Sequence, residues 1–338
     1  MNPTPASQAL TRRTVLGVGV AVAVLFGTTG CGVTGGEGDA SDGSIANLQL
    51  LVPNDPGGGY DVTGRTALQI MDETGIVGAT EVTNLPGAGG TVGLARTVNE
   101  AGNADFLMVM GLGVVGAAYT NETDAAIGDA TPIARLIEEA GAIFVPASSP
   151  YQDMDDLVTA WKADPAAFPV GGGSSPGGPD HLLPMQLAAA VGIDPTEVNF
   201  VSYAGGGELL PAVLGGQLAF AASGYPEFLD QVESGDLRIL AVTSAERVPV
   251  VDAPTLQEQG IDLEFTNWRG LLAPPELTDE QTTRLIDAVT EMQGTDEWQQ
   301  ALETNGWTDA FLAGDEYAQF LTEQDERVRG VLDELGLL

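Results

Sequence analysis

The sequence has very little cysteine, histidine and lysine, and these shortages exclude several classes of function. Its 338 residues include one cysteine, Cys31, one histidine, His181, and one lysine, Lys162. A lone cysteine cannot form an internal disulfide, and a lone histidine leaves no ligand set for zinc, so we expect neither a metal site nor a cofactor. Lysine and arginine together number 12 against 48 acidic residues. Because binding of phosphates needs basic side chains, nucleic acid is excluded as a partner.

Long apolar runs are also absent. The apolar run at residues 15–26 is shorter than the roughly 20 residues that a membrane-spanning helix needs. It follows Arg12-Arg13, in a context that resembles a twin-arginine export motif, so residues 1–30 are predicted to be a signal peptide. Removing them takes away two arginines and no acidic residue, which changes the net charge from −36 to −38.

Cys31 follows Thr28-Thr29-Gly30, and this position resembles a lipoprotein processing site, although Thr28 stands where leucine is usual. The alternative is an idle or buried thiol. Residues 31–44 are mostly small and polar, which predicts a flexible tether. A diacyl lipid on Cys31 would hold the folded domain at the outer face of the cytoplasmic membrane.

Glycine, by contrast, is abundant, with 45 residues. Four times a short apolar run breaks into a glycine-rich loop that opens a helical pattern: 48–52 into 56–61, 80–84 into 86–90, 168–170 into 171–175, and 198–202 into 203–207. A helix N-terminus has unpaired N–H groups and a partial positive charge, and glycine lets a ligand approach that backbone. The four loops together predict a cleft lined by backbone donors that holds an anion.

Strand-like runs alternate with helical patterns, which predicts an α/β protein with mostly parallel strands. Further strands are expected at 106–110, 143–146, 218–222, 237–242 and 268–273. Helices are expected at 61–73, 91–101, 154–163, 180–191, 208–214, 227–233, 279–292, 296–305 and 315–334. After Pro274-Pro275 only helices are predicted. The length without the signal peptide suits two lobes rather than one core.

These loops and several later motifs resemble the tripartite tricarboxylate transporter receptors, the Bug or TctC family. The resemblance runs in order from about residue 46 to the C-terminus. It is carried by residues 53–65, 84–93, 203–207, 214–217, 240–244, 254–256 and 268–274.

The resemblance implies a type II periplasmic-binding-protein fold with two lobes that close over a carboxylate. Lobe 1 would comprise residues 45–144 and 268–338, and lobe 2 residues 145–267, with crossovers near Val145 and Trp268. The ligand would be a small di- or tricarboxylate, and the partners would be the permease subunits of the membrane transporter. A monomer without enzymatic activity is expected.

Candidate ligand contacts come from the same loops. Backbone donors are expected at Gly58, Gly59, Gly87, Ala88, Gly89, Gly90, Gly205 and Gly206, and side-chain contacts at Tyr60, Asp61, Thr91, Ser174, Ser175, His181, Tyr203 and Tyr225. Each side chain also has a structural interpretation. Asp61 can be a helix N-cap that pairs with Arg65, the hydroxyl residues and His181 can cap helices or turns, and the tyrosines can be ordinary packing residues.

Two other functions remain as alternatives. The chain could present its ligand to a signalling kinase instead of a permease. Residues 173–177 match G-x-S-x-G, the nucleophile motif of α/β-hydrolases, which would make Ser175 an esterase nucleophile. Pro176 and Pro179 interrupt the helix that this motif requires, and His181 as the sole candidate base lies too close in sequence for a usual triad. The glycine loops also lack the phosphate-binding patterns of nucleotide sites.

Overall fold

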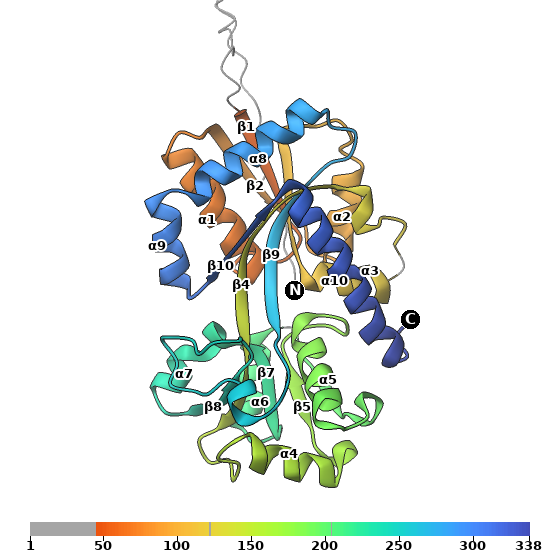
Figure 1. The fold of residues 1–338 in the computed structure, drawn as a ribbon, viewed down its shortest axis with the longest axis vertical. Helices are drawn as coiled ribbons and strands as arrows, with labels where there is room; N and C mark the ends of the chain where they lie inside the picture. Colours follow the sequence, from red (N-terminus) through yellow and green to blue (C-terminus); the bar gives the residue numbers. More distant parts are fainter. Residues whose placement is uncertain (1–44, 122, 204) are drawn as a thin grey trace, which may run out of the picture. The chain divides into compact units, whose positions relative to one another are not determined.

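A computed structural model of the chain describes residues 45–121, 123–203 and 205–338 (Figure 1). These residues belong to one compact unit. The predicted signal peptide, the predicted tether and Cys31 lie outside the described residues, as does Ala204 of the fourth glycine loop. In the described ranges, no helix is both long enough and apolar enough to cross a membrane.

The described part of the chain contains ten strands in one mixed sheet. They are β1 (Ile45–Val52), β2 (Val77–Asn84), β3 (Phe106–Gly111), β4 (Thr131–Pro146), β5 (Val170–Gly172), β6 (Phe200–Ser202), β7 (Phe220–Gly224), β8 (Leu237–Val242), β9 (Thr266–Ala273) and β10 (Thr308–Ala313). Neighbours follow the order β2-β1-β3-β9-β4-β7-β5-β6, and β8 and β10 also pair with β4. Strand β1 is parallel to β2 and β3, and β5 is parallel to β6 and β7. All pairs of β4 and β9 are antiparallel.

Helices flank this sheet (Figure 1). They are α1 (Gly59–Glu73), α2 (Thr91–Val98), α3 (Leu112–Thr120), α4 (Met154–Ala163), α5 (Pro179–Val191), α6 (Gly206–Leu214), α7 (Leu229–Glu233), α8 (Asp279–Gln293), α9 (Asp296–Asn305) and α10 (Gly314–Glu334). Short 3₁₀ turns include η1 (Ala88–Gly90), η5 (Tyr225–Phe228) and η6 (Gln257–Gln259).

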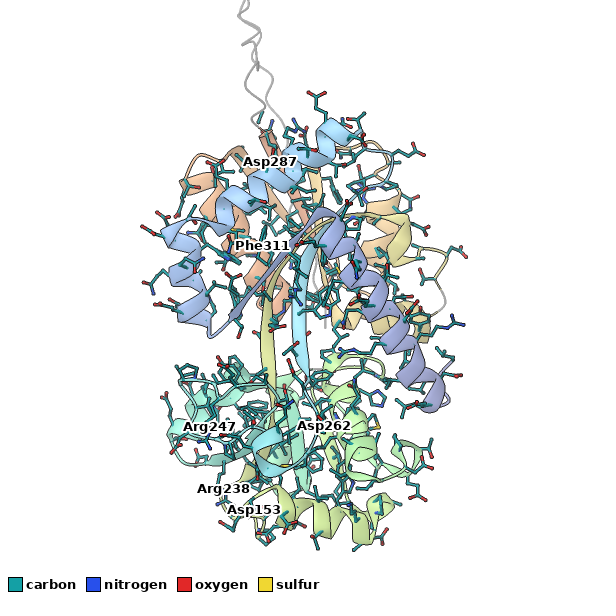
Figure 2. All side chains as sticks on the ribbon, in the orientation of Figure 1. Asp153, Arg238, Arg247, Asp262, Asp287 and Phe311 are labelled. Carbon is teal, nitrogen blue, oxygen red and sulfur yellow. The ribbon has the colours of Figure 1, made fainter. Side chains whose placement is uncertain are left out.

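Strand β4 connects two regions of the sheet because it changes partners midway. Residues 131–140 pair with β9, and part of this stretch also pairs with β10. Residues 141–146 pair with β7 and β8. We call β1, β2, β3, β9, β10 and residues 131–140 the upper region, and β5–β8 with residues 141–146 the lower region, as they lie in Figure 1. In Figure 2 the labels Asp287 and Phe311 lie in the same half of the molecule as the upper region, and Arg238 and Asp262 lie in the same half as the lower region.

The predicted order of strand, glycine loop and helix is confirmed at all four loops. Helices α1, α2, α5 and α6 begin at the loops that follow β1, β2, β5 and β6. The carboxyl ends of parallel strands meet at one edge of a sheet. The loops after β1 and β2 are therefore neighbours in the upper region, and those after β5 and β6 are neighbours in the lower region.

Aromatic side chains fill the core of each region. In the lower region the ring of Trp161 from α4 lies edge-on to Phe220 of β7, with centroids 5.1 Å apart. In the upper region Trp298 of α9 packs against Trp307, with centroids 6.1 Å apart. Trp161 and Trp298 are fully buried. Burial of such large apolar surfaces fixes the helices against the sheet and so fixes the loops at their ends.

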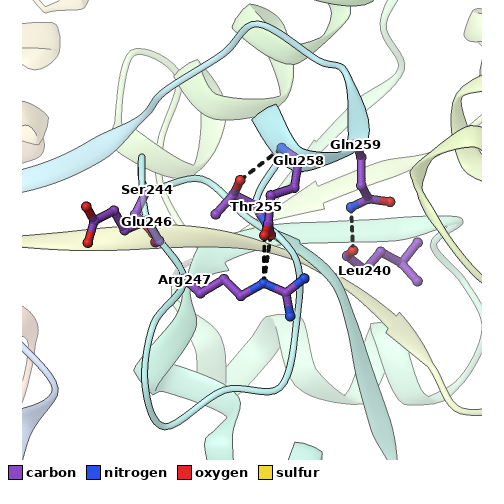
Figure 3. A network of polar contacts seen from close by, with 7 residues as sticks. All are labelled: Leu240, Ser244, Glu246, Arg247, Thr255, Glu258 and Gln259. Atoms are coloured by element: carbon purple, nitrogen blue, oxygen red, sulfur yellow. Dashed lines mark hydrogen bonds and ion pairs between the residues drawn. The ribbon is translucent and has the colours of Figure 1, made fainter.

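Polar contacts hold the segment between β8 and β9 (Figure 3). Arg247 pairs with the Glu258 carboxylate at 2.8 Å, and the same carboxylate accepts a 2.8 Å hydrogen bond from the Thr255 N–H. The side chain of Gln259 donates to the carbonyl of Leu240 at 2.9 Å. These contacts attach η6 to β8, so the chain enters β9 from a defined position.

Three elements differ from the sequence prediction. The strand expected at 143–146 is the longer β4, Thr131–Pro146. The expectation of only helices after Pro275 is wrong, because β10 pairs antiparallel with β4. Its six residues show little alternation of polar and apolar side chains, and a bulge between Asp309 and Leu312 interrupts its register with β4. Helix α3 was not predicted because it is apolar on nearly all sides and contains two glycines, which removes the helical period that marks a half-buried helix. It lies against α2, α10 and the sheet.

The close approach of α1 to the sheet predicts a matched pair of glycine substitutions. A Cβ at Gly64 would lie 2.6 Å from Val109 Cγ2 and 2.7 Å from Leu50 Cδ2, whereas one at Gly330 on α10 would meet open space. Gly64→Ala should lower the free energy of unfolding by about 1–3 kcal/mol through overpacking. Gly330→Ala should raise it by up to ~1 kcal/mol through helix propensity. Urea denaturation checks both, and equal stability of the two variants would contradict this packing of α1.

Candidate functional site

The four glycine loops converge on one cavity of about 810 Å³, lined by residues of both sheet regions. Ten of the residues predicted to contact ligand line it: Gly58, Gly59, Tyr60, Gly87, Ala88, Gly89, Gly90, Ser174, Ser175 and Tyr203. The loops therefore face a common space, as their placement between strands and helices predicts. Ligand contact by these residues stays a prediction.

Open backbone donors lie at the upper end of the cavity. Helix α1 has Gly58 as its N-cap, and no side chain caps it. Within the described residues, the N–H groups of Gly59, Tyr60, Ala88 and Gly89 donate no hydrogen bond to the protein. The first N–H groups of a helix have no intrahelical partner, and successive N–H groups in a turn form an anion-binding concavity. This end of the cavity is built to accept negative charge.

Backbone conformation makes the second upper loop concave. Four consecutive residues have positive φ, namely Gly87 (152°), Ala88 (45°), Gly89 (64°) and Gly90 (101°). Residues with side chains rarely adopt this conformation, so three glycines are needed there, and Ala88 is one of two residues other than glycine with positive φ in the described ranges. The N–H groups of Ala88 and Gly89 in this turn have no acceptor among the described residues.

Tyr60 lies against the start of a third helix. A Cβ at Gly113 of α3 would lie 2.9 Å from the Tyr60 hydroxyl, so only glycine leaves room for the phenol there. Burial raises the pKa of Tyr60 to about 12 against the opposing effect of the Arg269 charge. The neutral phenol therefore forms part of the cavity wall beside α3.

The lower end of the cavity is different, because the protein's own acidic side chains bind two of its backbone donors, while the N–H groups of Ser174 and Ser175 have no acceptor among the described residues. Asp180 accepts from the Gly173 N–H at 3.0 Å, and Glu227 accepts from the Gly206 N–H at 2.9 Å. Ser223 Oγ lies 3.1 Å from Asp180 Oδ2 and 2.5 Å from Glu227 Oε2. Burial, and then the neighbouring Glu227 charge, raise the pKa of Asp180 to about 7. All three side chains line the cavity.

A buried ion pair lies between the two ends. Arg269 of β9 pairs with Glu139 of β4 at 2.5 Å and also donates to Thr63 Oγ1 at 3.2 Å. The other Glu139 oxygen accepts from Trp307 Nε1 at 3.0 Å. Arg269 and Glu139 are 7% and 8% exposed, so their mutual neutralisation is needed for both to stay charged. Arg269 is the one basic side chain among the described residues that line the cavity.

The loops before α1 and α5 share one local structure. Gly57 and Gly177 have φ of 85° and 84°, and the N-caps Gly58 and Gly178 are both extended. In each case the third helical residue accepts a hydrogen bond from the first glycine: Asp61 from Gly57 at 2.9 Å and His181 from Gly177 at 3.1 Å. Both acceptors therefore close a loop, and neither lines the cavity.

The N-cap interpretation of Asp61 is consequently wrong, since Gly58 holds that position. The predicted pair with Arg65 is present at 2.8 Å, and Asn84 donates to the same carboxylate at 2.8 Å. Burial opposes ionisation of Asp61, but the hydrogen bonds from Gly57, Asn84 and Arg65 outweigh it and lower its pKa.

The remaining predicted residues outside the cavity lining have structural contacts. Thr91 donates to the Ala88 carbonyl at 3.0 Å, and Tyr225 donates to the Gly306 carbonyl at 2.5 Å, which joins the lower region to the segment after α9. Gly205 is the N-cap of α6, and the Gly206 N–H is bound by Glu227. A direct ligand contact by these four residues stays a prediction, but their polar groups already have the roles described.

Sequence reasoning missed the charged residues of the site and the two polar side chains bound to them. These are Glu139, Asp180, Glu227 and Arg269, with Ser223 and Trp307. A signal was present for two of them. Glu139 and Arg269 are charged residues inside long apolar strands, and such residues need a buried partner. In the described ranges, no group of three potential ligand side chains could hold a metal ion.

Comparison with known proteins agrees with this geometry. The model of the tripartite tricarboxylate transporter family receptor matches residues 71–337. The chain belongs to this receptor family. It is 27% identical over 298 residues to the UPF0065 protein in the gbd 5'region of Cupriavidus necator, covering 86% of this chain and 88% of that protein.

Solved structures of other proteins have the same fold. A TctC solute binding protein from Polaromonas, without ligand, is 26% identical with a TM-score of 0.70 and covers 86% of this chain and 99% of its own. R. palustris Rpa4515 with adipate is 21% identical with a TM-score of 0.75, covering 86% and 97%. The predicted family and the α/β periplasmic-binding-protein fold are thereby confirmed. Tripartite tricarboxylate receptors are extracytoplasmic solute-binding proteins that work with the membrane components of a transporter.

The buried ion pair of this receptor predicts a specific pattern of stability changes. Arg269→Gln leaves Glu139 charged and buried without its cation, so the free energy of unfolding should fall by about 3–5 kcal/mol. The double variant Arg269→Gln/Glu139→Gln should be clearly more stable than Arg269→Gln alone. Chemical denaturation measures both, and a double variant that is less stable than the single one would contradict the pairing.

Asp180 and His181 predict opposite pH dependences. Burial lowers the pKa of His181 to about 4 from 6.5, so the unfolded chain takes up a proton first and His181 reduces stability as the pH falls from about 6.5 to 4. Asp180 keeps its proton to about pH 7 in the fold and loses it near 3.8 when unfolded, so its contribution falls as the pH rises through this window.

Denaturation curves between pH 4 and 7 separate these two effects. Relative to the native protein, His181→Asn should make stability fall more, or rise less, with rising pH. Asp180→Asn should change the slope in the other direction. Identical slopes in the two variants would contradict these assignments.

Proposed function

We propose that this receptor is a lipid-anchored extracytoplasmic protein that captures a small organic carboxylate and delivers it to the permease subunits of its transporter. The observation that carries the proposal is the set of open N–H groups at Gly59, Tyr60, Ala88 and Gly89 on one cavity wall. A charge-assisted hydrogen bond contributes about 1.5–3 kcal/mol, and micromolar affinity needs about 8 kcal/mol. Several such bonds are therefore sufficient without an arginine. The adipate in Rpa4515 supports a carboxylate of the di- or tricarboxylate class.

Capture would occur by closure of two lobes, residues 45–144 with 268–338 against residues 145–267. In support, β4 runs from the upper sheet region into the lower one, and the chain returns to the upper region where β9 begins. Opposite this junction α3 approaches the loop before α5, where Thr120 Oγ1 lies 3.4 Å from the Pro176 carbonyl. Bending of the two strands would open or close that side of the cavity.

The anchor rests on the sequence. An export signal followed by Cys31 and a small-residue tether would leave the receptor attached by lipid and free to reach the permease. We propose that it acts as a monomer.

Esterase chemistry has little support in the site. His181 uses Nδ1 to accept from the Gly177 N–H, and burial lowers its pKa to about 4. An imidazole with this pKa is a weak general base at neutral pH. We therefore propose that the receptor binds its ligand without converting it.

A thermal-shift experiment tests the function. The purified protein is heated with citrate, succinate, malate, adipate, glutamate and aromatic acids, and at least one carboxylate should raise its melting temperature because it binds only the folded state. If none did, the receptor proposal would fail.

Gly116→Ala provides a matched test of closure. A Cβ at Gly116 of α3 would overlap the carbonyl oxygen of Gly177, whereas one at Gly128 would meet open space. Gly116→Ala should reduce the ligand-induced rise in melting temperature, and Gly128→Ala should preserve it. An undiminished shift in Gly116→Ala would contradict closure on this side of the cavity.

A further inference from the structure

The two ends of the cavity differ in what they offer a ligand. The upper end has N–H groups of Gly59, Tyr60, Ala88 and Gly89 without a protein acceptor in the described residues. At the lower end the N–H groups of Gly173 and Gly206 are bound by Asp180 and Glu227. The N–H groups of Ser174 and Ser175 at the lower end also lack an acceptor among the described residues, and beside them the lower end presents the carboxylate oxygens of Asp180 and Glu227, which are hydrogen-bond acceptors.

The hydrogen bonds at the lower end are incomplete. Ser223 Oγ lies within hydrogen-bond distance of both Asp180 Oδ2 and Glu227 Oε2, but a hydroxyl has one hydrogen to donate. One of these two carboxylates consequently lacks a proton donor in this contact. Asp180 Oδ1 has no hydrogen-bond partner within the part of the chain that the structure describes. A further proton or a cation would complete these hydrogen bonds.

No side chain of the site supplies that cation. Arg269 already forms an ion pair with Glu139, and it is the one basic side chain lining the cavity in the described ranges. A second carboxylate on the ligand would enter a space that Asp180 and Glu227 make negative, since the charge of Glu139 is balanced by Arg269. An ammonium group would instead donate to the free oxygens, and its charge would be balanced by the buried carboxylates.

We propose that the organic acid bound by this receptor also carries an ammonium group, which lies between Asp180 and Glu227 while its carboxylate meets the N–H groups of α1 and η1. This inference rests on the proposed function and narrows its ligand class. The ligand is a zwitterion with its charges at opposite ends of the cavity, rather than a plain di- or tricarboxylate.

Matched ligands test this proposal by calorimetry and thermal shift. The pairs have the same number of carbons and differ at one end: 4-aminobutyrate against succinate, and 5-aminovalerate against glutarate. Butyrate and valerate serve as reference acids whose far end is uncharged. Aspartate and glutamate extend the set to α-amino acids. At least one ammonium-bearing acid should bind about tenfold more tightly than the matched dicarboxylate and the matched reference acid.

Two variants place the ammonium group. Asp180→Asn and Glu227→Gln keep an oxygen that can accept from Gly173 and Gly206 but remove the charge. Each should weaken binding of the ammonium-bearing acid by about tenfold and leave binding of the reference acid, butyrate or valerate, nearly unchanged. Asp262→Asn removes a charge from an exposed residue outside the cavity lining and should change neither (Figure 2). Circular dichroism and the ligand-free melting temperature verify that all variants fold.

The outcomes distinguish this inference from the proposed function. Tighter binding of a dicarboxylate overturns the inference and leaves the carboxylate receptor intact. Dicarboxylate binding that strengthens below pH 7 also overturns it, because a protonated Asp180 would then be the donor. Equal binding by native protein and both variants overturns it as well. If no organic acid binds, the proposed function fails together with the inference.

Discussion

The structure depends on how the backbone N–H groups at its glycine loops find acceptors. Each loop joins a strand to a helix, and each exposes donors that no helical turn can satisfy. In the upper region α1 and η1 leave several donors open toward the cavity. In the lower region Asp180 and Glu227 bind those of Gly173 and Gly206, while those of Ser174 and Ser175 stay open. The carboxylates of Asp180 and Glu227, which line the same cavity, therefore set the polarity of its lower end.

The loops before α1 and α5 have the same backbone conformation but different side chains, and this produces the difference between the upper and lower ends of the cavity. Both have a glycine with positive φ, an extended glycine N-cap and a third helical residue that accepts from the first glycine. The second helical residue differs: Tyr60 directs its hydroxyl to α3, whereas Asp180 turns to the Gly173 N–H and Ser223. A phenol in one loop and a carboxyl group in the other therefore give equivalent positions unlike charges.

The ion pair of Arg269 and Glu139 links the site to the sheet. Glu139 lies on β4, which joins the two regions, and Arg269 lies on its neighbour β9; both residues line the cavity. A buried pair of this kind keeps both groups charged and fixes the separation of the strands around it. It also uses the cavity's arginine, so the lower carboxylates have no cation from the protein.

The sequence by itself determined the α/β class, the order of strands, loops and helices, and the glycine loops as backbone donors, because glycine placement and hydrophobic pattern are local signals. It also carried the resemblance to the receptor family that the match over residues 71–337 confirms. It did not determine β10 or α3, whose patterns reflect their neighbours rather than themselves. Only the tertiary structure decided which donors stay open, because Asp180 reaches Gly173 across the loop before α5 and Glu227 reaches Gly206 from η5, and both distances depend on how these loops fold.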